Sequence, residues 1–201
     1  MSKINIIDPG HDNTLDPGAL GKLYRLGAER LITEAGLNMP VANRVIALTE
    51  NYQQCFLTRR WDTPGPVSLA SRVEIANNQL WSKGGGYSRE EVRLISIHHN
   101  SYNKPEVNGL EVYYKEGCWQ SKELADRMRE NIISSYQSAG YAIQDRGTKT
   151  APFYVLRNSF IPAVLVELGF MSNPVELDFI SSPAGCVAGG YGIALTLLEF
   201  E

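Results

Sequence analysis

Three short apolar runs in this sequence each lead into a side chain that could bind a metal ion or transfer a proton. In open α/β sheets, ligands gather beyond the carboxyl ends of the strands. If the three runs are neighbouring parallel strands, two imidazoles and one carboxylate converge at a single edge of the sheet. The residues concerned are His11, His98 and Glu167, which follow the apolar runs 4–7, 94–97 and 163–166.

Zinc is the metal that matches this set of side chains. It accepts imidazole nitrogen and carboxylate oxygen, and a catalytic zinc site keeps a fourth position for water. The three cysteines, Cys55, Cys118 and Cys186, lie far apart and share no metal-ligand spacing. They are interpreted as single thiols, because neither a disulfide framework nor a cysteine zinc site fits their number and spacing. The metal ligands should therefore be histidines and carboxylates.

A structural role is the alternative for each of these residues. A lone histidine is more often a satisfied structural residue than a metal ligand, although the three histidines of this chain all lie at or next to strand ends. Glu167 interrupts an apolar strand, where a buried carboxylate is costly unless it is paired or metal-bound. A structural salt bridge would also satisfy it.

The elements that must position these residues alternate between strands and helices. Residues 1–201 are long enough for one domain with a full hydrophobic core. The pattern predicts an α/β fold: a single domain with a twisted, largely parallel mixed sheet and helices on both faces. The predicted strands are Ile4–Ile7, Cys55–Thr58, Leu94–His98, Leu110–Tyr114, Phe153–Leu156 and Ala163–Leu168.

Helices are predicted from apolar positions that recur at helical spacing. Two sets are predicted to share a helix face, Val41/Val45/Leu48 and Leu69/Val73/Ala76/Leu80. Two more helices are predicted to carry Leu124/Met128/Ile132 and Val187/Tyr191/Ala194/Leu198. Ser68 is predicted as an N-cap, and Asn173-Pro174 and Ser182-Pro183 as caps followed by proline at the first helical position. Because proline is tolerated in the first turn, Pro40 predicts a helix that starts near Leu37, with Glu34 just before it.

Composition and charge exclude several classes of function. Hydrophobic residues make up 43% and charged residues 20%, and the net charge is −3 with no strongly basic stretch. We therefore expect no nucleic-acid partner. No apolar run approaches the ~20 residues that span a bilayer, so we expect no membrane insertion. The apolar run at the N-terminus is too short for a signal peptide, which predicts synthesis in the cytoplasm without one. Nothing indicates the oligomeric state.

A set of ordered motifs covers most of the chain, from Ile6 to about Leu177. They are Ile7–His11, Asp16–Gly21, Leu57–Arg59, Ser68–Asn77, Ser96–His98, Gly109–Tyr114, Asp145–Gly147, Phe153–Arg157 and Pro162–Asn173. Through these motifs the sequence resembles the N-acetylmuramoyl-L-alanine amidase family, the catalytic domain shared by bacterial autolysins and phage endolysins. Each motif alone is weak, but their combination in this order is specific.

The resemblance implies a zinc ion bound by His11, Glu34 and His98, with Glu167 as the catalytic carboxylate. Glu34 is implied by its place in Glu34–Asn38 just before the first long helix, and Glu29 is a nearby competitor. The implied activity is zinc-dependent hydrolysis of the amide between N-acetylmuramic acid and L-alanine in peptidoglycan, in cell wall lysis or remodelling. Lack of an export segment would then fit delivery to the wall through a holin or a delivery apparatus.

His99 and Arg146 are candidate substrate contacts. His98 is preferred over His99 as the ligand, because Ser-Ile-His-x-Asn places the ligand of the family first. His99 is expected either to support the site or to contact substrate. Arg146 could bind a carboxylate or a phosphate-like group through its planar guanidinium, and a structural role is the alternative.

The sequence also departs from the pattern of the family. The loop from His11 to Asp16 is one residue longer than usual, with Asp12 and Asn13 in place of glycines. Trp81–Glu91 is expected to be an exposed insertion, or alternatively a wall of the substrate cleft. Two other functions stay open: a non-catalytic peptidoglycan-binding protein of the same fold, and a zinc peptidase that acts on stem peptides.

Overall fold

The computed structural model describes residues 3–12, 14–25, 28–63, 65–80, 88–89 and 91–200, without the side chains of residues 24 and 25. Most of the predicted insertion Trp81–Glu91 lies outside the described residues, so that prediction stays untested. The described part forms a six-stranded sheet covered by helices, with a separate two-stranded hairpin.

The sheet has the strand order β4-β1-β5-β8-β6-β7. Four neighbouring strands run parallel, β6 runs antiparallel to β8, and β7 runs parallel to β6. The sheet is therefore mixed and largely parallel, as predicted. Its strands are β1 (Ile4–Pro9), β4 (Gln54–Leu57), β5 (Val92–Asn100), β6 (Leu110–Tyr114), β7 (Asp145–Thr150) and β8 (Ala163–Phe170).

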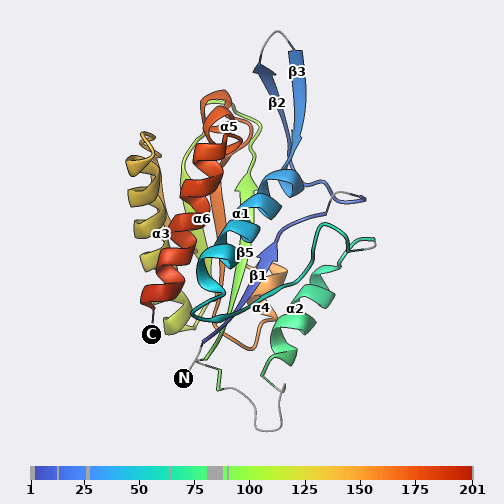
Figure 1. The fold of residues 1–201 in the computed structure, drawn as a ribbon, viewed down its shortest axis with the longest axis vertical. Helices are drawn as coiled ribbons and strands as arrows, with labels where there is room; N and C mark the ends of the chain where they lie inside the picture. Colours follow the sequence, from blue (N-terminus) through green and yellow to red (C-terminus); the bar gives the residue numbers. More distant parts are fainter. Residues whose placement is uncertain are drawn as a thin grey trace.

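Helices cover both faces of the sheet (Figure 1). On one face α1 (Glu34–Thr49), α3 (Trp119–Ser138) and α6 (Pro183–Glu199) pack on a buried cluster that includes Ile95, Val166 and Leu168. On the other face α2 (Leu69–Asn78) and α4 (Tyr154–Arg157) enclose a second cluster with Ile6, Leu94 and Leu165. Successive side chains along a strand point to opposite faces, so the same strands contribute to both buried clusters. The sheet with helices on both faces confirms the predicted fold class.

The hairpin projects from the carboxyl end of β1 (Figure 1). It consists of β2 (Leu20–Arg25) and β3 (Ala28–Thr33), paired antiparallel. Its side chains Leu23 and Ile32 are buried and pack against residues that include Leu177 of α5 (Pro174–Ile180). The sequence did not predict this hairpin, because most of β3 is exposed and carries no alternating apolar pattern.

One predicted element was wrong, and one strand was missed. Phe153–Leu156 was predicted as a strand, but residues 154–157 form the short helix α4, whose Val155 and Leu156 are buried against the sheet. Four apolar residues in a row cannot distinguish a strand from one helical turn. The strand β7 was missed because Asp145–Thr150 is almost entirely polar and lies at the edge of the sheet.

Helix α1 begins at Glu34 and not near Leu37. Thr33 is its N-cap and accepts a hydrogen bond from Gly36 N, and Pro40 lies in the second turn. The prediction was wrong because the cap and the buried face of the helix outweigh the cost of one missing backbone hydrogen bond. The shift matters for the site, since it makes Glu34 the first residue of the helix.

The other predicted helix starts are confirmed. Ser68, Asn173 and Ser182 each cap a helix through a side-chain oxygen, and Pro174 and Pro183 open their helices. Leu69 does not share the buried face of α2, because it is exposed. In the described part of the chain, no single helix is long and apolar enough to cross a membrane; α5 and α6 pass such a test only as a pair bent by 74°.

Candidate metal centre and active site

Three predicted ligands meet at the carboxyl edge of the sheet. Glu34 Oε1 lies 2.8 Å from His98 Nδ1, and Glu34 Oε2 lies 3.2 Å from His11 Nε2. One ligand atom from each residue falls within 4.8 Å of the others. Donor atoms at ~2.0–2.2 Å from a tetrahedral zinc ion lie roughly 3.3 Å from one another. The two Glu34–histidine distances are close to this value, so the three residues form a group that could hold one metal ion.

Glu34 is held in place by the backbone as well as by the imidazoles. Ala19 N donates to its Oε2 at 2.9 Å, and His99 N donates to its Oε1 at 3.2 Å. Burial alone would raise the pKa of this carboxyl, but hydrogen bonds and charge attraction from His11 and His98 lower it well below its usual range. Glu34 is therefore a carboxylate at neutral pH, which is the state that binds a metal ion.

His11 owes its position to an unusual backbone and to Asp16. Its φ of 59° is the single positive value among the described residues other than glycine. Its Nδ1 lies 2.9 Å from Asp16 Oδ1, which leaves Nε2 directed at Glu34. Burial lowers the pKa of His11, but Glu34 and Asp16 raise it to a net value of about 8. A carboxylate on the second ring nitrogen is the usual way to orient a metal-binding histidine. The sequence motif contained Asp16 without indicating this role.

Two glycines allow the close approach of the ligands. A Cβ atom at Gly10 would lie 2.2 Å from His98 Cε1. At Gly18, with φ +70°, it would lie 2.6 Å from Glu34 Oε2. A side chain at either position would displace a ligand, and at Gly18 it would also strain the backbone.

A buried polar network holds the loop that carries His11. Asp8 accepts hydrogen bonds from Thr58 Oγ1 at 2.5 Å, Ser96 Oγ at 2.6 Å and Arg72 Nη1 at 2.6 Å. Burial raises the pKa of Asp8, but Arg72 and the two hydroxyls lower it to a net value below its usual range. Arg72 Nη2 also donates to His11 O at 2.8 Å. The network thus ties β1, β5 and α2 to the loop that carries His11.

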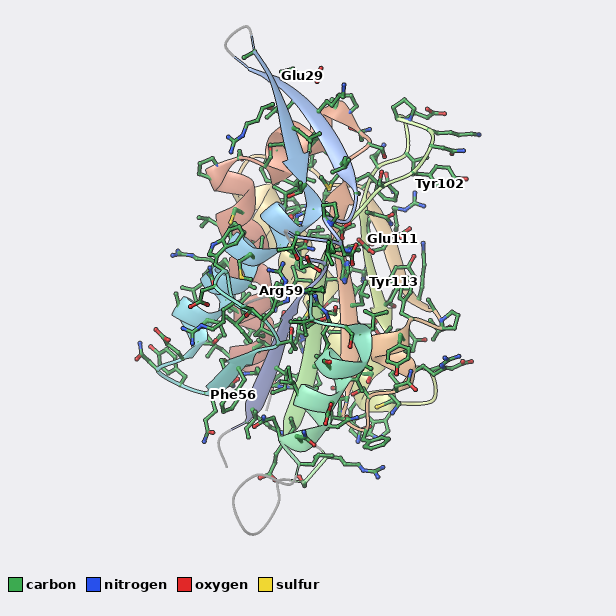
Figure 2. The ribbon with its side chains drawn as sticks, turned by 90° about the vertical axis from the view of Figure 1, so that its right-hand side faces the viewer. Glu29, Phe56, Arg59, Tyr102, Glu111 and Tyr113 are labelled. Atoms are coloured by element: carbon green, nitrogen blue, oxygen red, sulfur yellow. The ribbon has the colours of Figure 1, made fainter. Side chains whose placement is uncertain are left out.

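A second buried arginine supports the same loop. Arg59 Nε donates to Pro9 O at 3.0 Å, and its Nη2 donates to Gly10 O at 3.2 Å. Figure 2 shows Arg59 in the interior of the molecule, between the strands and α1. Sequence motifs contained Arg59 and Arg72 but did not show that both arginines bind backbone carbonyls.

Glu167 stands next to the candidate metal centre. It is the register partner of His98 in the parallel pair β5–β8. Its Oε2 is buried and has no hydrogen-bond partner among the described residues. Burial, together with the nearby charges of Glu34 and Glu111, raises the pKa of Glu167 well above its usual range. An unsatisfied carboxyl of this kind is typical of a group that exchanges protons.

His99 lies beside the ligands but faces the interior. It is 2% exposed, and its Nδ1 lies 2.7 Å from Asn38 Oδ1. Asn38 Nδ2 in turn donates to Gly10 O at 3.1 Å. Burial lowers the pKa of His99 to about 4, so its imidazole is neutral at physiological pH. Of the two roles left open for His99, this environment favours support of the loop over contact with substrate.

Arg146 and Glu29 lie in different surroundings. Arg146 Nε donates to Glu111 Oε1 at 2.6 Å, and its guanidinium carbon lies 5.2 Å from the centre of the Phe170 ring. Glu29, the competitor of Glu34, lies on the hairpin strand β3 and pairs with Lys22 at 3.1 Å (Figure 2). The carboxylate next to the two histidines is therefore that of Glu34.

A cavity of about 300 Å³ opens on one side of the candidate centre. Its lining includes His11 and His98 and, at the start of α2 and just before it, Pro66, Val67 and Leu69. The site is thus accessible to a molecule larger than water.

Comparison with known families identifies a relationship over nearly the whole chain. Residues 6–198 match the family model described as N-acetylmuramoyl-L-alanine amidase. The chain is 33% identical over 171 residues to the N-acetylmuramoyl-L-alanine amidase LytC of Bacillus subtilis, covering 83% of this chain and 29% of LytC. It is 34% identical over 204 residues to the sporulation-specific N-acetylmuramoyl-L-alanine amidase of the same organism, covering 98% of this chain and 69% of that protein.

A comparison with solved structures also finds an amidase. The N-acetylmuramoyl-L-alanine amidase AmiC2 of Nostoc punctiforme superposes with a TM-score of 0.78 at 35% identity, covering 98% of this chain and 96% of that one. The chain is shorter than several of its relatives, since it spans 29%, 52% and 32% of the length of LytC and two further cell wall amidases.

Proposed function

Because the chain belongs to the N-acetylmuramoyl-L-alanine amidase family, we propose that it hydrolyses the amide between N-acetylmuramic acid and L-alanine in peptidoglycan. The observation that carries the proposal is the convergence of His11, Glu34 and His98 beside the unsatisfied carboxyl of Glu167. Peptidoglycan is accordingly the proposed partner, and cell wall lysis or remodelling the proposed role.

Zinc is the proposed cofactor, held by His11, Glu34 and His98. Two imidazoles and one carboxylate are a catalytic zinc donor set, and the spacing of their atoms fits a single ion. A bound zinc ion would polarise the amide carbonyl and lower the pKa of a water molecule toward ~7. Asp16 keeps the His11 ring oriented for this task, and the Asp8–Arg72 pair fixes the loop.

Glu167 performs the proton transfers in the proposed reaction. Its Oε2 accepts a proton from the attacking water as the oxygen of that water adds to the amide carbonyl. A bound zinc ion would favour the carboxylate form that accepts this proton, and burial, which raises the pKa of Glu167, would favour its transfer onward from a neutral carboxyl. Glu167 then passes it to the nitrogen of L-alanine as the amide bond breaks, so that the peptide leaves as an amine.

Arg146 is the proposed contact for a negative group on substrate, since its guanidinium is partly exposed and contacts Glu111, which is opposite Glu167 in the sheet. His99 is proposed to act indirectly, by holding Asn38 and through it the carbonyl of Gly10.

Digestion of purified sacculi tests the proposal against its alternatives. We expect zinc-loaded protein to release peptides that begin with a free L-alanine amine, with one zinc ion per chain by elemental analysis. Wall binding without any release would indicate a non-catalytic binding protein. New amines on other stem residues would indicate a peptidase and contradict the amidase assignment.

A further inference from the structure

A basic pair lies on the strand edge beside Glu167. Arg146 Nε and Lys149 Nζ both donate to Glu111 Oε1, at 2.6 Å and 2.7 Å. Their side chains are 35% and 38% exposed, whereas Glu111 is 3% exposed. The carboxylate of Glu111 also accepts hydrogen bonds from Tyr113 Oη at 2.7 Å and Asn100 Nδ2 at 3.1 Å.

This cluster faces the same side of the sheet as Glu167. Glu111 of β6 is directly opposite Glu167 in the antiparallel pair β6–β8. Side chains that are directly opposite in such a pair project from the same face. Figure 2 shows Glu111 and Tyr113 along β6, with Tyr102 beyond Glu111 on the same side of the molecule. Arg146 and Lys149 belong to the next strand, β7, so they border the site on the side of Glu167.

The two cations outnumber the carboxylate that they contact directly, and the other carboxylate near Arg146, that of Glu176, accepts hydrogen bonds from Gly109 N and Phe170 N. Two cations share one oxygen of Glu111, and Nη2 of Arg146 has no hydrogen-bond partner among the described residues. The fixed position of the two cations and their partial exposure leave donors available for an anion. A guanidinium and an ammonium group held close together are suited to bind a carboxylate.

The orientation of the bound substrate can be inferred from the proton transfer by Glu167. This inference rests on the proposed function. Glu167 protonates the leaving nitrogen, so the peptide half of the bound substrate must extend from the scissile bond on the side of Glu167. The acyl side then extends toward the cavity lined by Pro66, Val67 and Leu69. We propose that Arg146 and Lys149 form a subsite for the free carboxylate of the second residue of the stem peptide, and that Glu111 positions both cations.

Peptide binding to the metal-free protein tests the subsite without relying on turnover. The ligands are the tripeptide L-alanyl-γ-D-glutamyl-L-lysine, the same peptide with the carboxylate of its second residue amidated, and the peptide with only its terminal carboxylate amidated. Calorimetry should show that amidation of the second residue weakens binding about 10-fold or more, roughly the value of one charge-assisted contact, whereas terminal amidation changes little.

Substitutions test whether Arg146 and Lys149 cause the weaker binding of the amidated peptide. Arg146→Gln and Lys149→Gln should bind the free acid as weakly as the wild type binds the amide, and should no longer distinguish the two. Lys122→Gln is the matched control, because Lys122 is an exposed lysine paired with Asp126 on α3. It should bind all three peptides like the wild type. Glu111→Gln, checked for an unchanged melting temperature, should reduce the discrimination because the cations lose their common partner.

The outcomes separate this inference from the proposed function. Equal wild-type affinity for acid and amide would overturn the subsite, and sensitivity to the terminal carboxylate alone would overturn its assignment to the second residue. Full discrimination by a well-folded Glu111→Gln variant would overturn the positioning role. Failure of the zinc-loaded wild type to cleave muramoyl tripeptides would instead refute the amidase proposal, whatever the peptides bind.

Discussion

Glu167 and His98 occupy matching positions on the neighbouring parallel strands β8 and β5. The separation of adjacent strands, roughly 4.8 Å, therefore sets how far the proposed proton-transfer group lies from a proposed metal ligand. Because both residues belong to the central strands of the sheet, their relative position does not depend on a loop.

Replacement of Glu167 by glutamine should abolish most activity without loss of metal. Glutamine keeps the shape of the side chain but cannot accept a proton. Positioned proton transfer contributes ~10²–10⁴-fold to rate, so turnover of sacculi should fall by about that factor. Elemental analysis should still find zinc at the wild-type level. Near-normal turnover by the variant would show that another group transfers the proton.

Much of this arrangement could be predicted from the sequence, because apolar strands and their polar ends are local features. The runs that became β1, β5 and β8 were correctly identified, and with them His11, His98 and Glu167 at one edge. The residues themselves could not select Glu34 over Glu29. That choice depended on family resemblance, and physically it depends on the Thr33 cap, which makes Glu34 the first residue of α1.

The parts that could not be predicted depend on contacts between distant residues. The strand β7 is polar and is recognisable only by its pairing with β6. Nothing in the sequence around Glu111 indicates a function, because its proposed role depends on ion pairs with Arg146 and Lys149 on another strand. The same holds for Asp8, whose partners Ser96 and Arg72 are 88 and 64 residues away.

Substitution of the two adjacent histidines should separate a ligand from a supporting residue. His98→Ala removes a donor atom next to Glu34, so zinc and activity should be lost together. His99→Ala removes the contact with Asn38, so zinc should be retained while the melting temperature falls, because a buried side chain is lost. Elemental analysis and thermal melts measure both effects. Equal zinc loss in two folded variants would contradict the assignment.

Asp16→Asn should weaken metal binding without abolishing it. The carboxylate at 2.9 Å from His11 Nδ1 orients the ring, and loss of such a partner typically costs ~10–100-fold in metal affinity. Competition with a chromophoric zinc chelator gives the affinity. Asp62→Asn, at an exposed aspartate, is the control and should match the wild type. An unchanged affinity in Asp16→Asn would mean that the His11 backbone alone fixes the ring.

Gly10→Ala should impair the site through a single methyl group. A Cβ atom there would lie within 2.6 Å of three atoms of the His98 ring, so the ring must move away from Glu34. Zinc affinity should therefore fall by at least ~10-fold, as expected for a displaced ligand. Gly189→Ala in α6 is the comparison, since its added Cβ atom would meet the Tyr136 hydroxyl at 3.2 Å and Leu168 at 3.5 Å, neither of which is a proposed metal ligand. Wild-type affinity in Gly10→Ala would show that the loop can absorb the methyl group.

Asp8→Asn should destabilise the metal-free protein in a pH-dependent way. Removal of one partner from a buried ion pair costs roughly 3–5 kcal/mol, and here Arg72 would be left without its carboxylate. The folded-state pKa of Asp8 lies below its ordinary value of 3.8, so the stability that its charge contributes is present above pH 3.8. It is lost as the pH falls through the lower folded-state value.

The difference in unfolding free energy between the wild type and Asp8→Asn should therefore be constant from pH 7 to about pH 5 and should shrink below pH 3.8. At low pH the wild type itself carries a neutral aspartic acid and resembles the variant. Urea titrations of both proteins across this range measure the difference, with Glu74→Gln on the exposed face of α2 as a control that should show none. A gap that persists or widens on acidification would mean that Asp8 stabilises the loop through its hydrogen-bonding shape and not through its charge.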